Sequence, residues 1–132
     1  MKRNAVRLNV LLVLVAGLAA CGAGSAAPAD SGVRGIVLIG PMCPVVQEGV
    51  PCPDRPFEAT IRVHRGSADG KVVAAARSGA DGRFRVNLAP GRYVLEPLAP
   101  RPGSPPYASP VAVEVRPHAF TRVTIGFDSG IR

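Results

Sequence analysis

The chain of 132 residues has no tryptophan, two tyrosines and two histidines, and aromatic side chains make up only 5% of it. Proteins that bind single-stranded nucleic acid stack bases on aromatic side chains, so this composition argues against a nucleic-acid partner. There is no C-x-x-C pair, and only three cysteines accompany His64 and His118. Zinc sites and thioredoxin-like centres depend on closely spaced cysteines or histidines. We therefore expect no metal, redox centre or other cofactor.

The sequence also lacks an apolar run long enough to span a membrane. Its apolar segment at residues 10–20 has eleven residues, whereas a spanning helix needs about 20. Three basic residues precede this segment, at positions 2, 3 and 7. A basic start followed by a short apolar stretch and small residues is typical of a secretory signal peptide. We therefore expect residues 1–20 to direct export and to be removed.

The apolar segment ends in Leu18-Ala19-Ala20-Cys21. This tetrapeptide resembles the lipobox of bacterial lipoproteins, in which the cysteine sulfur receives a diacylglyceryl group and becomes the first residue after cleavage. The resemblance implies that Cys21 is a lipid anchor to a bacterial membrane. Each buried CH2 of an acyl chain contributes about 0.8 kcal/mol to membrane binding, so such an anchor holds firmly. The alternative is an ordinary cleaved signal peptide with a coincidental cysteine.

Residues 21–32 continue as small, polar and unpatterned sequence after the cysteine. This composition is typical of a flexible tether. Gly22 stands where an aspartate usually signals retention in the inner membrane. In a cell with two membranes we therefore expect the protein to lie on the outer membrane, facing the periplasm.

Cys43 and Cys52 remain as a pair once Cys21 carries lipid. Disulfides persist outside the cytoplasm, and the spacing of this pair does not fit the short spacings of zinc sites. We expect a structural disulfide, with a soft-metal site or free thiols as the alternatives. Closing a loop of about ten residues in this way contributes roughly 2–3 kcal/mol in the chain-entropy model.

The part of the chain after residue 20 is mildly basic. It holds 13 of the 16 lysines and arginines and all nine acidic residues, so its net charge is +4 rather than +7. Lys71 is its only lysine. Residues 33–132 are enough for one domain with a single core.

Most of this domain alternates apolar and polar residues with period two, which is typical of half-buried strands. In residues 83–88, phenylalanine, valine and leucine alternate with arginine and asparagine. Asp-Gly or Pro-Gly turns at 69–70, 81–82 and 90–91 join neighbouring strands. This pattern predicts an all-β, seven-stranded antiparallel β-sandwich. The expected strands are 33–39, 57–64, 71–77, 83–88, 92–96, 111–116 and 122–127.

Residues 78–97, SGADGRFRVNLAPGRYVLEP, carry a more specific pattern. They resemble the prealbumin-like sandwich of carboxypeptidase regulatory-like and Cna-B-type domains, with the pattern D-x-x-G-x-F-x-x-x-L-x-P-G-x-Y-x-L. The resemblance covers about residues 33–128 and implies a transthyretin- or Ig-like sandwich, because the pattern consists of turn and core residues. The matching positions are Gly82, Phe84, Leu88, Pro90, Gly91, Tyr93 and Leu95.

The sequence does not indicate the hydrolase or isopeptide chemistry found in some proteins of related fold. Transthyretin-like hydroxyisourate hydrolases end in Tyr-Arg-Gly-Ser, whereas this chain ends in Asp-Ser-Gly-Ile-Arg. Cna-B-type domains form an isopeptide from a lysine, and Lys71 lies beside a predicted turn, where we expect it to be exposed. We interpret His64 and His118 as surface histidines. We therefore expect that the protein is not an enzyme. The alternative, a catalytic role, would need one of these histidines beside a carboxylate in a cleft.

Alternation predicts that several arginines face outward, some of them on one sheet face. Such a basic stripe suits anionic lipid head groups, lipopolysaccharide phosphates or peptidoglycan carboxylates. The alternative is a solvated face with cross-strand pairs to Glu58, Glu96 and Glu114. The arginines are Arg62, Arg83, Arg85, Arg116 and Arg122.

Two irregular segments are the candidate binding loops. One is the stapled region at 40–56, and the other is the proline-rich stretch at 97–110. Loops on a rigid scaffold commonly carry binding function. We expect a non-catalytic interaction or accessory module with an envelope protein or glycan as partner; the alternative is a small-ligand or carbohydrate-binding domain that uses Tyr93 and Tyr107. The candidate binding residues are Gln47, Glu48, Asp54, Arg55, Arg101 and Tyr107.

Overall fold

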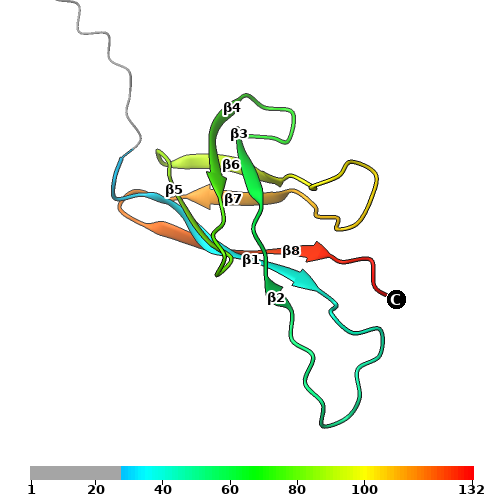
Figure 1. Ribbon diagram of the computed structural model, residues 1–132. Helices are drawn as coiled ribbons and strands as arrows, with labels where there is room; N and C mark the ends of the chain where they lie inside the picture. Colours follow the sequence, from blue (N-terminus) through cyan, green and yellow to red (C-terminus); the bar gives the residue numbers. More distant parts are fainter. Residues whose placement is uncertain (1–27) are drawn as a thin grey trace, which may run out of the picture.

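The computed structural model describes residues 28–132, which form two packed β-sheets and no helix (Figure 1). Cys21 and the expected signal peptide lie outside the described residues. No described segment is a helix long and apolar enough to cross a membrane. The strands are β1 Gly32–Gly40, β2 Arg55–Pro56, β3 Thr60–Arg65, β4 Val72–Arg77, β5 Arg83–Asn87, β6 Gly91–Pro97, β7 Val111–Val115 and β8 Phe120–Asp128.

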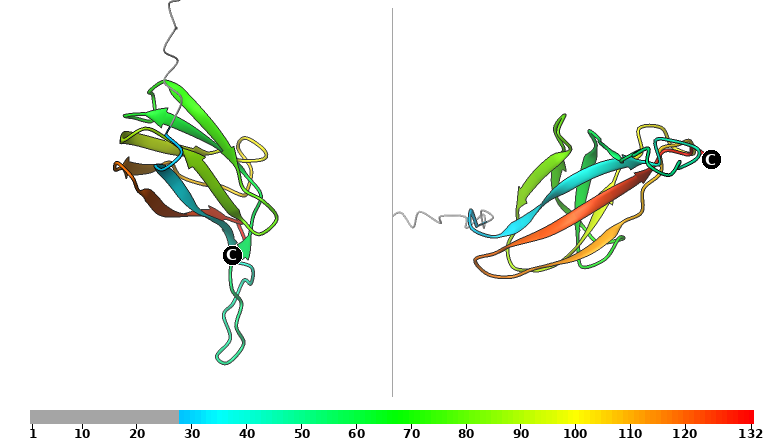
Figure 2. Two further views of the ribbon diagram at one scale, coloured as in Figure 1. Left: turned by 90° about the vertical axis from the view of Figure 1, so that its left-hand side faces the viewer. Right: turned by 90° about the horizontal axis from the view of Figure 1, so that it is seen from below.

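The first sheet is organised around β1, which pairs with all three other strands of the sheet. β8 runs parallel to β1 along its whole length. On the other edge of β1, β5 pairs with its first half and the short β2 pairs with its end, both antiparallel. The second sheet is antiparallel throughout, in the order β4-β3-β6-β7. Figure 2 shows the two sheets as separate layers.

The predicted β-sandwich is confirmed, with corrections in detail. Residues 28–132 form eight strands rather than seven, because two residues of the stapled region pair with β1 as β2. The sheets are not wholly antiparallel, since β1 and β8 are parallel. Period-two alternation reports which face of a strand is buried and is the same for either direction of its neighbour. Ser31, the residue before β1, is buried, and its hydroxyl donates to the Leu88 carbonyl oxygen at 2.7 Å.

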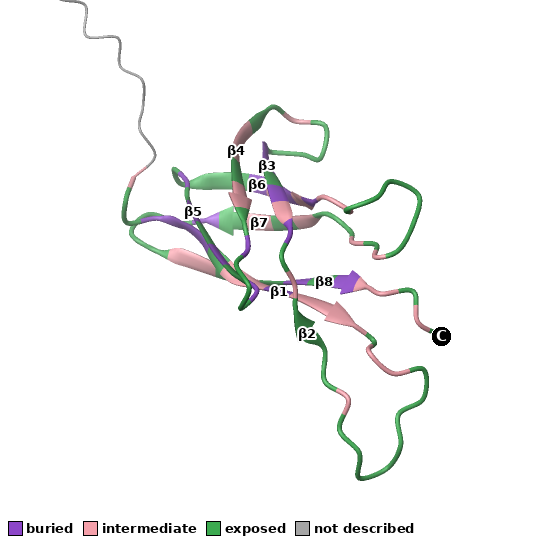
Figure 3. Cartoon of the chain, in the orientation of Figure 1, coloured by how far each residue is buried: buried purple, intermediate pink, exposed green. Residues whose placement is uncertain are grey.

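The core consists of the inward-facing residues of both sheets (Figure 3). In β5, Phe84 and Val86 are buried while the arginines on either side are exposed, as the alternation predicts. Burying an aliphatic or phenyl side chain stabilises the folded state by about 1.5–3 kcal/mol. These buried side chains therefore hold the two sheets together. The core residues are Val33, Val37, Ala59, Ile61, Val63, Phe84, Val86, Leu88, Tyr93, Leu95, Val115, Ile125 and Phe127.

The residues of the prealbumin-like pattern have turn and core positions in the structure. Gly82 has a φ of +75° in the turn before β5, a conformation that favours glycine. Tyr93 is only 2% exposed, and its hydroxyl donates to the Ala89 carbonyl oxygen at 2.6 Å. Tyr93 thus fastens the turn before β6 and does not offer an aromatic surface to a ligand.

Candidate functional site

The parallel pairing of β1 and β8 brings three segments together at one end of the sandwich. The two strands are in register from Gly32 opposite Phe120 to Gly40 opposite Asp128. The segments that follow them therefore leave from the same end. We use the name loop end for this surface, which comprises the stapled loop at 41–54, the proline-rich loop at 98–110 and the C-terminal segment at 129–132 (Figure 2).

The C-terminal strand joins the two loops through backbone hydrogen bonds. Tyr107 and Asp128 each donate an N–H to the other's carbonyl oxygen, at 2.9 and 2.7 Å. On the other side, the Ser129 N–H donates to the Gly40 carbonyl oxygen at 2.9 Å and its hydroxyl donates to that of Pro41 at 2.5 Å. The two loops are therefore held at fixed positions relative to each other.

A charged cluster closes the C-terminal segment. The Arg132 guanidinium donates to both carboxylate oxygens of Asp128, at 3.1 and 2.9 Å, and the Gly130 N–H donates to the same carboxylate at 2.9 Å. These bonds, that of Arg132 foremost, lower the pKa of Asp128 to about 2. The chain end is thereby folded back onto β8.

The stapled loop carries an apolar tip. Cys43 and Cys52 form a disulfide, which confirms that prediction. Between them, Val45, Val46 and Val50 are 69%, 77% and 57% exposed. Exposed apolar side chains that cluster in one place commonly mark an interaction surface. In Figure 1 this loop extends away from the body of the sandwich.

The predicted loop residues divide between the tip and the base of the stapled loop. Gln47 and Glu48 are exposed at the tip, where the Val50 N–H donates to the Gln47 carbonyl oxygen at 3.1 Å. Asp54 lies at the base against Gly40, where an added Cβ would be 1.8 Å from its Oδ1. Arg55 is exposed in β2, opposite Ile39. The loop end therefore contains Gln47, Glu48 and Asp54, and Arg55 lies next to it in β2.

The proline-rich loop contributes the other two. Tyr107 is about half exposed, and Arg101 is exposed in a turn in which the Ser104 N–H donates to its carbonyl oxygen at 3.3 Å. A shallow hollow of about 410 Å³ lies beside Tyr107, between the start of β7 and the end of β8. The sequence analysis missed the C-terminal segment and the three valines. The Val-Val pair between prolines in a stapled loop was the available signal for the latter.

The interpretation of His64 as a surface histidine is wrong, because its side chain is buried, with 7% of the residue exposed. The turn after β3 folds over it, so that His64 Nδ1 donates to the Gly70 carbonyl oxygen at 2.9 Å. Its Nε2 donates to the Glu96 carboxylate from β6. These two bonds raise the pKa of His64. Both ring nitrogens are thus engaged within the fold.

His118 is exposed, as expected, in the turn between β7 and β8. Its Nδ1 lies 2.5 Å from an Asp30 carboxylate oxygen, and its φ of +55° is unusual for a residue other than glycine. Neither histidine lines the hollow beside Tyr107. Within residues 28–132, no three His, Cys, Asp or Glu side chains are gathered as a metal site.

The outward arginines are arranged differently on the two sheets. On the second sheet, Arg62 lies opposite Glu96 and Arg92 lies opposite Glu114. This is the solvated arrangement of cross-strand pairs. On the first sheet, Arg34 lies between two other arginines. The basic stripe therefore belongs to the first sheet and includes an arginine that the sequence analysis did not single out.

No protein-family model matches this chain, and no curated protein sequence is similar to it. Among solved structures, it is similar to the crystal structure of GBS52, the minor pilin of the Gram-positive pathogen Streptococcus agalactiae. The TM-score is 0.51 at 15% sequence identity, over 76% of this chain and 44% of the pilin chain. At this identity the likeness shows the fold, a β-sandwich of the kind found in this pilin. This chain matches less than half the length of the pilin.

Proposed function

We propose that the protein is an exported bacterial lipoprotein, anchored through Cys21, whose sandwich is a non-catalytic module that contacts an envelope protein through the loop end. The observation that carries this proposal is the convergence of two fastened loops at one end of β1, while the expected anchor precedes its other end. A strand of nine residues spans about 26 Å from its first to its last residue. The loop end is therefore set apart from the point where the chain leads to the anchor.

The disulfide supports the exported location. Disulfides persist in oxidising compartments outside the cytoplasm, and Cys43 and Cys52 are joined. The staple also limits the freedom of the valine tip, so less conformational entropy is lost when a partner covers it. A restrained, exposed loop of this kind is suited to contact with a partner outside the cytoplasm.

The structure supports the hypothesis that the protein contacts another protein over the hypothesis that it binds a carbohydrate. An aromatic platform would need exposed tyrosines, and Tyr93 is buried, which leaves Tyr107 alone of the two. Catalysis has little support as well. The ring nitrogens of His64 are bonded to Gly70 and Glu96.

The test of the contact surface is cross-linking in intact cells followed by mass spectrometry of the captured proteins. Replacing the three tip valines by serine should abolish capture of one dominant partner, and replacing 98–106 by a Gly/Ser loop should weaken it. The second replacement retains Tyr107, whose backbone bonds fasten the loop to β8. The matched control is Val72→Ser, which removes an exposed valine from β4. Only scattered neighbours, or equal loss in the control, would contradict the proposal.

The test of the anchor is the intact mass of the protein from the membrane fraction. We expect loss of residues 1–20 and a diacylglycerol adduct, and we expect Cys21→Ser to release the protein from membranes. A soluble protein with an unmodified Cys21 would rule out the lipid anchor. In that case the protein would reach the envelope by another route.

A further inference from the structure

Three arginines form one transverse row on the outward face of the first sheet. Arg34 of β1 lies directly opposite Arg85 of β5 on one side and Arg122 of β8 on the other. All three side chains are exposed. In an antiparallel pair, directly opposed residues such as Arg34 and Arg85 have Cβ atoms about 4.5–5.5 Å apart, and like charges at this distance destabilise a sheet. The row of three arginines therefore destabilises the sheet when no anion is bound to it.

No carboxylate within the described part of the chain forms an ion pair with these three arginines. On the second sheet, Arg62 and Arg92 each lie opposite a glutamate, whereas the residues on both sides of Arg34 are arginines. The guanidinium of Arg85 lies over the ring of Phe120, 3.9 Å from its centroid. This contact orients one end of the row without neutralising its charge.

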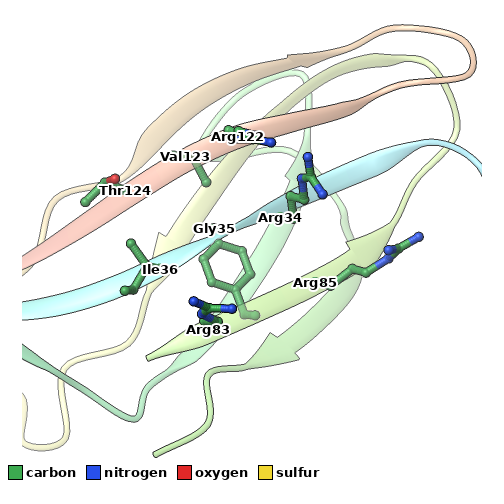
Figure 4. Close-up of a pocket in the computed structure, with 9 residues that line it drawn as sticks. Arg34, Gly35, Ile36, Arg83, Arg85, Arg122, Val123 and Thr124 are labelled. Atoms are coloured by element: carbon green, nitrogen blue, oxygen red, sulfur yellow. The ribbon is translucent and has the colours of Figure 1, made fainter. Parts of the chain in front are cut away.

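A shallow hollow of about 590 Å³ borders the row (Figure 4). One side of the hollow is the arginine row, and the other side is the next row across the sheet, formed by Arg83, Ile36 and Thr124. Arg83 adds a fourth guanidinium, which forms a long, exposed ion pair with Asp81 at 3.9 Å. The hollow thus presents guanidinium groups around a partly apolar surface, which suits a group with a phosphate and an aliphatic part.

We infer that this arginine face docks on the anionic phospholipid head groups of the membrane that carries the anchor. The inference rests on the proposed lipid anchor for its geometry. Gly32 lies eleven positions after Cys21, and a segment of this length spans at most about 36–40 Å. Arg34 is the third residue of β1, so the row lies close to the point where the tether enters the domain. With this face on the membrane, the loop end points along the membrane and stays open to a partner.

The experiment is co-sedimentation with phospholipid vesicles, using the chain from residue 21 with Cys21→Ser so that no lipid is attached. We expect binding to phosphatidylcholine vesicles that contain phosphatidylglycerol and not to phosphatidylcholine alone. Binding should weaken as salt rises, because exposed charges are screened. Each arginine near an anionic surface contributes roughly fivefold, so replacing Arg34, Arg85 and Arg122 by glutamine should weaken binding roughly a hundredfold.

The matched control replaces Arg62, Arg77 and Arg92 by glutamine, which removes the same charge from the second sheet. It should retain most of the binding. The variant of the arginine row should unfold at the same or a higher urea concentration than the parent, since it relieves repulsion. Equal loss in both variants, no preference for phosphatidylglycerol, or binding only to soluble polyphosphate would overturn the inference. The mass of Cys21 tests the anchor separately, so failure of one proposal is distinguishable from failure of the other.

Discussion

The imidazole of His64 lies between two acceptors, the Gly70 carbonyl oxygen and the Glu96 carboxylate. Each ring nitrogen needs a hydrogen to donate, so this arrangement favours the protonated imidazolium. The Gly70 bond and then the Glu96 bond raise the pKa of His64 above 6.5, while partial burial and the charge of Arg62 oppose them. The pair thereby links the turn after β3 to β6, and this link depends on pH.

The first prediction concerns this dependence. Because the folded state holds the proton more tightly, the stability contributed by His64 is fully present below pH 6.5 and is lost as pH rises through the raised pKa. Urea unfolding at a series of pH values should show this decline in the parent. Glu96→Gln should reduce it, because the Gly70 bond remains, whereas Glu114→Gln on β7 should leave it unchanged. A decline of equal size in Glu96→Gln would show that another group is responsible.

The second prediction concerns the C-terminal cluster. Asp128 has a pKa of about 2, lowered from 3.8 chiefly by Arg132. Its contribution to stability is therefore present above pH 3.8 and is lost as pH falls toward 2. In carboxyl NMR titrations, Arg132→Gln should raise the pKa of Asp128 part of the way to 3.8, because the Gly130 N–H bond remains. Arg101→Gln is the control, and a shift there of similar size would contradict the assignment to Arg132.

The third prediction concerns the staple. Replacing Cys43 and Cys52 by alanine should lower the free energy of unfolding by roughly 2–3 kcal/mol, the chain-entropy value for a loop of this length. The sandwich should still fold, because no core residue lies between positions 41 and 54. Hydrogen exchange of the Val50 amide should accelerate, and alkylation of the parent without reductant should leave both cysteines unlabelled. Labelling of the parent would contradict the disulfide.

The fourth prediction concerns the close approach of strands at Gly35. A Cβ added there would lie 2.1 Å from the Val123 carbonyl oxygen and 3.0 Å from the Phe84 ring. Gly35→Ala should therefore cost about 1–3 kcal/mol of stability, as overpacking does in well-packed cores. Gly126→Ala on β8 is the matched control, since an added Cβ meets nothing within 4 Å. Equal unfolding midpoints for the two variants would show that β1 and β8 separate easily.

The burial of His64 shows where the sequence analysis reached its limit. Alternation places this side chain on the outward face of β3, and that direction is right. Its burial comes from the turn that returns over it and from a register shift between Val63 and His64 in the pairing of β3 with β4. Neither feature has a period that the sequence displays. Contacts across a turn depend on how the chain is folded back, which alternation does not report.

The sequence by itself determined the alternating core, the turns of the prealbumin-like pattern and the pairing of Cys43 with Cys52, because each depends on residue type and local spacing. Only the tertiary structure decided that β1 and β8 run parallel. That pairing places the stapled loop, the proline-rich loop and the chain end on one surface, and it aligns Arg34 with Arg122. The antiparallel pairing of β1 with β5 aligns Arg34 with Arg85. The physical reason is that side-chain direction is set within a strand, whereas the identity and direction of its neighbours are set by packing of the whole chain.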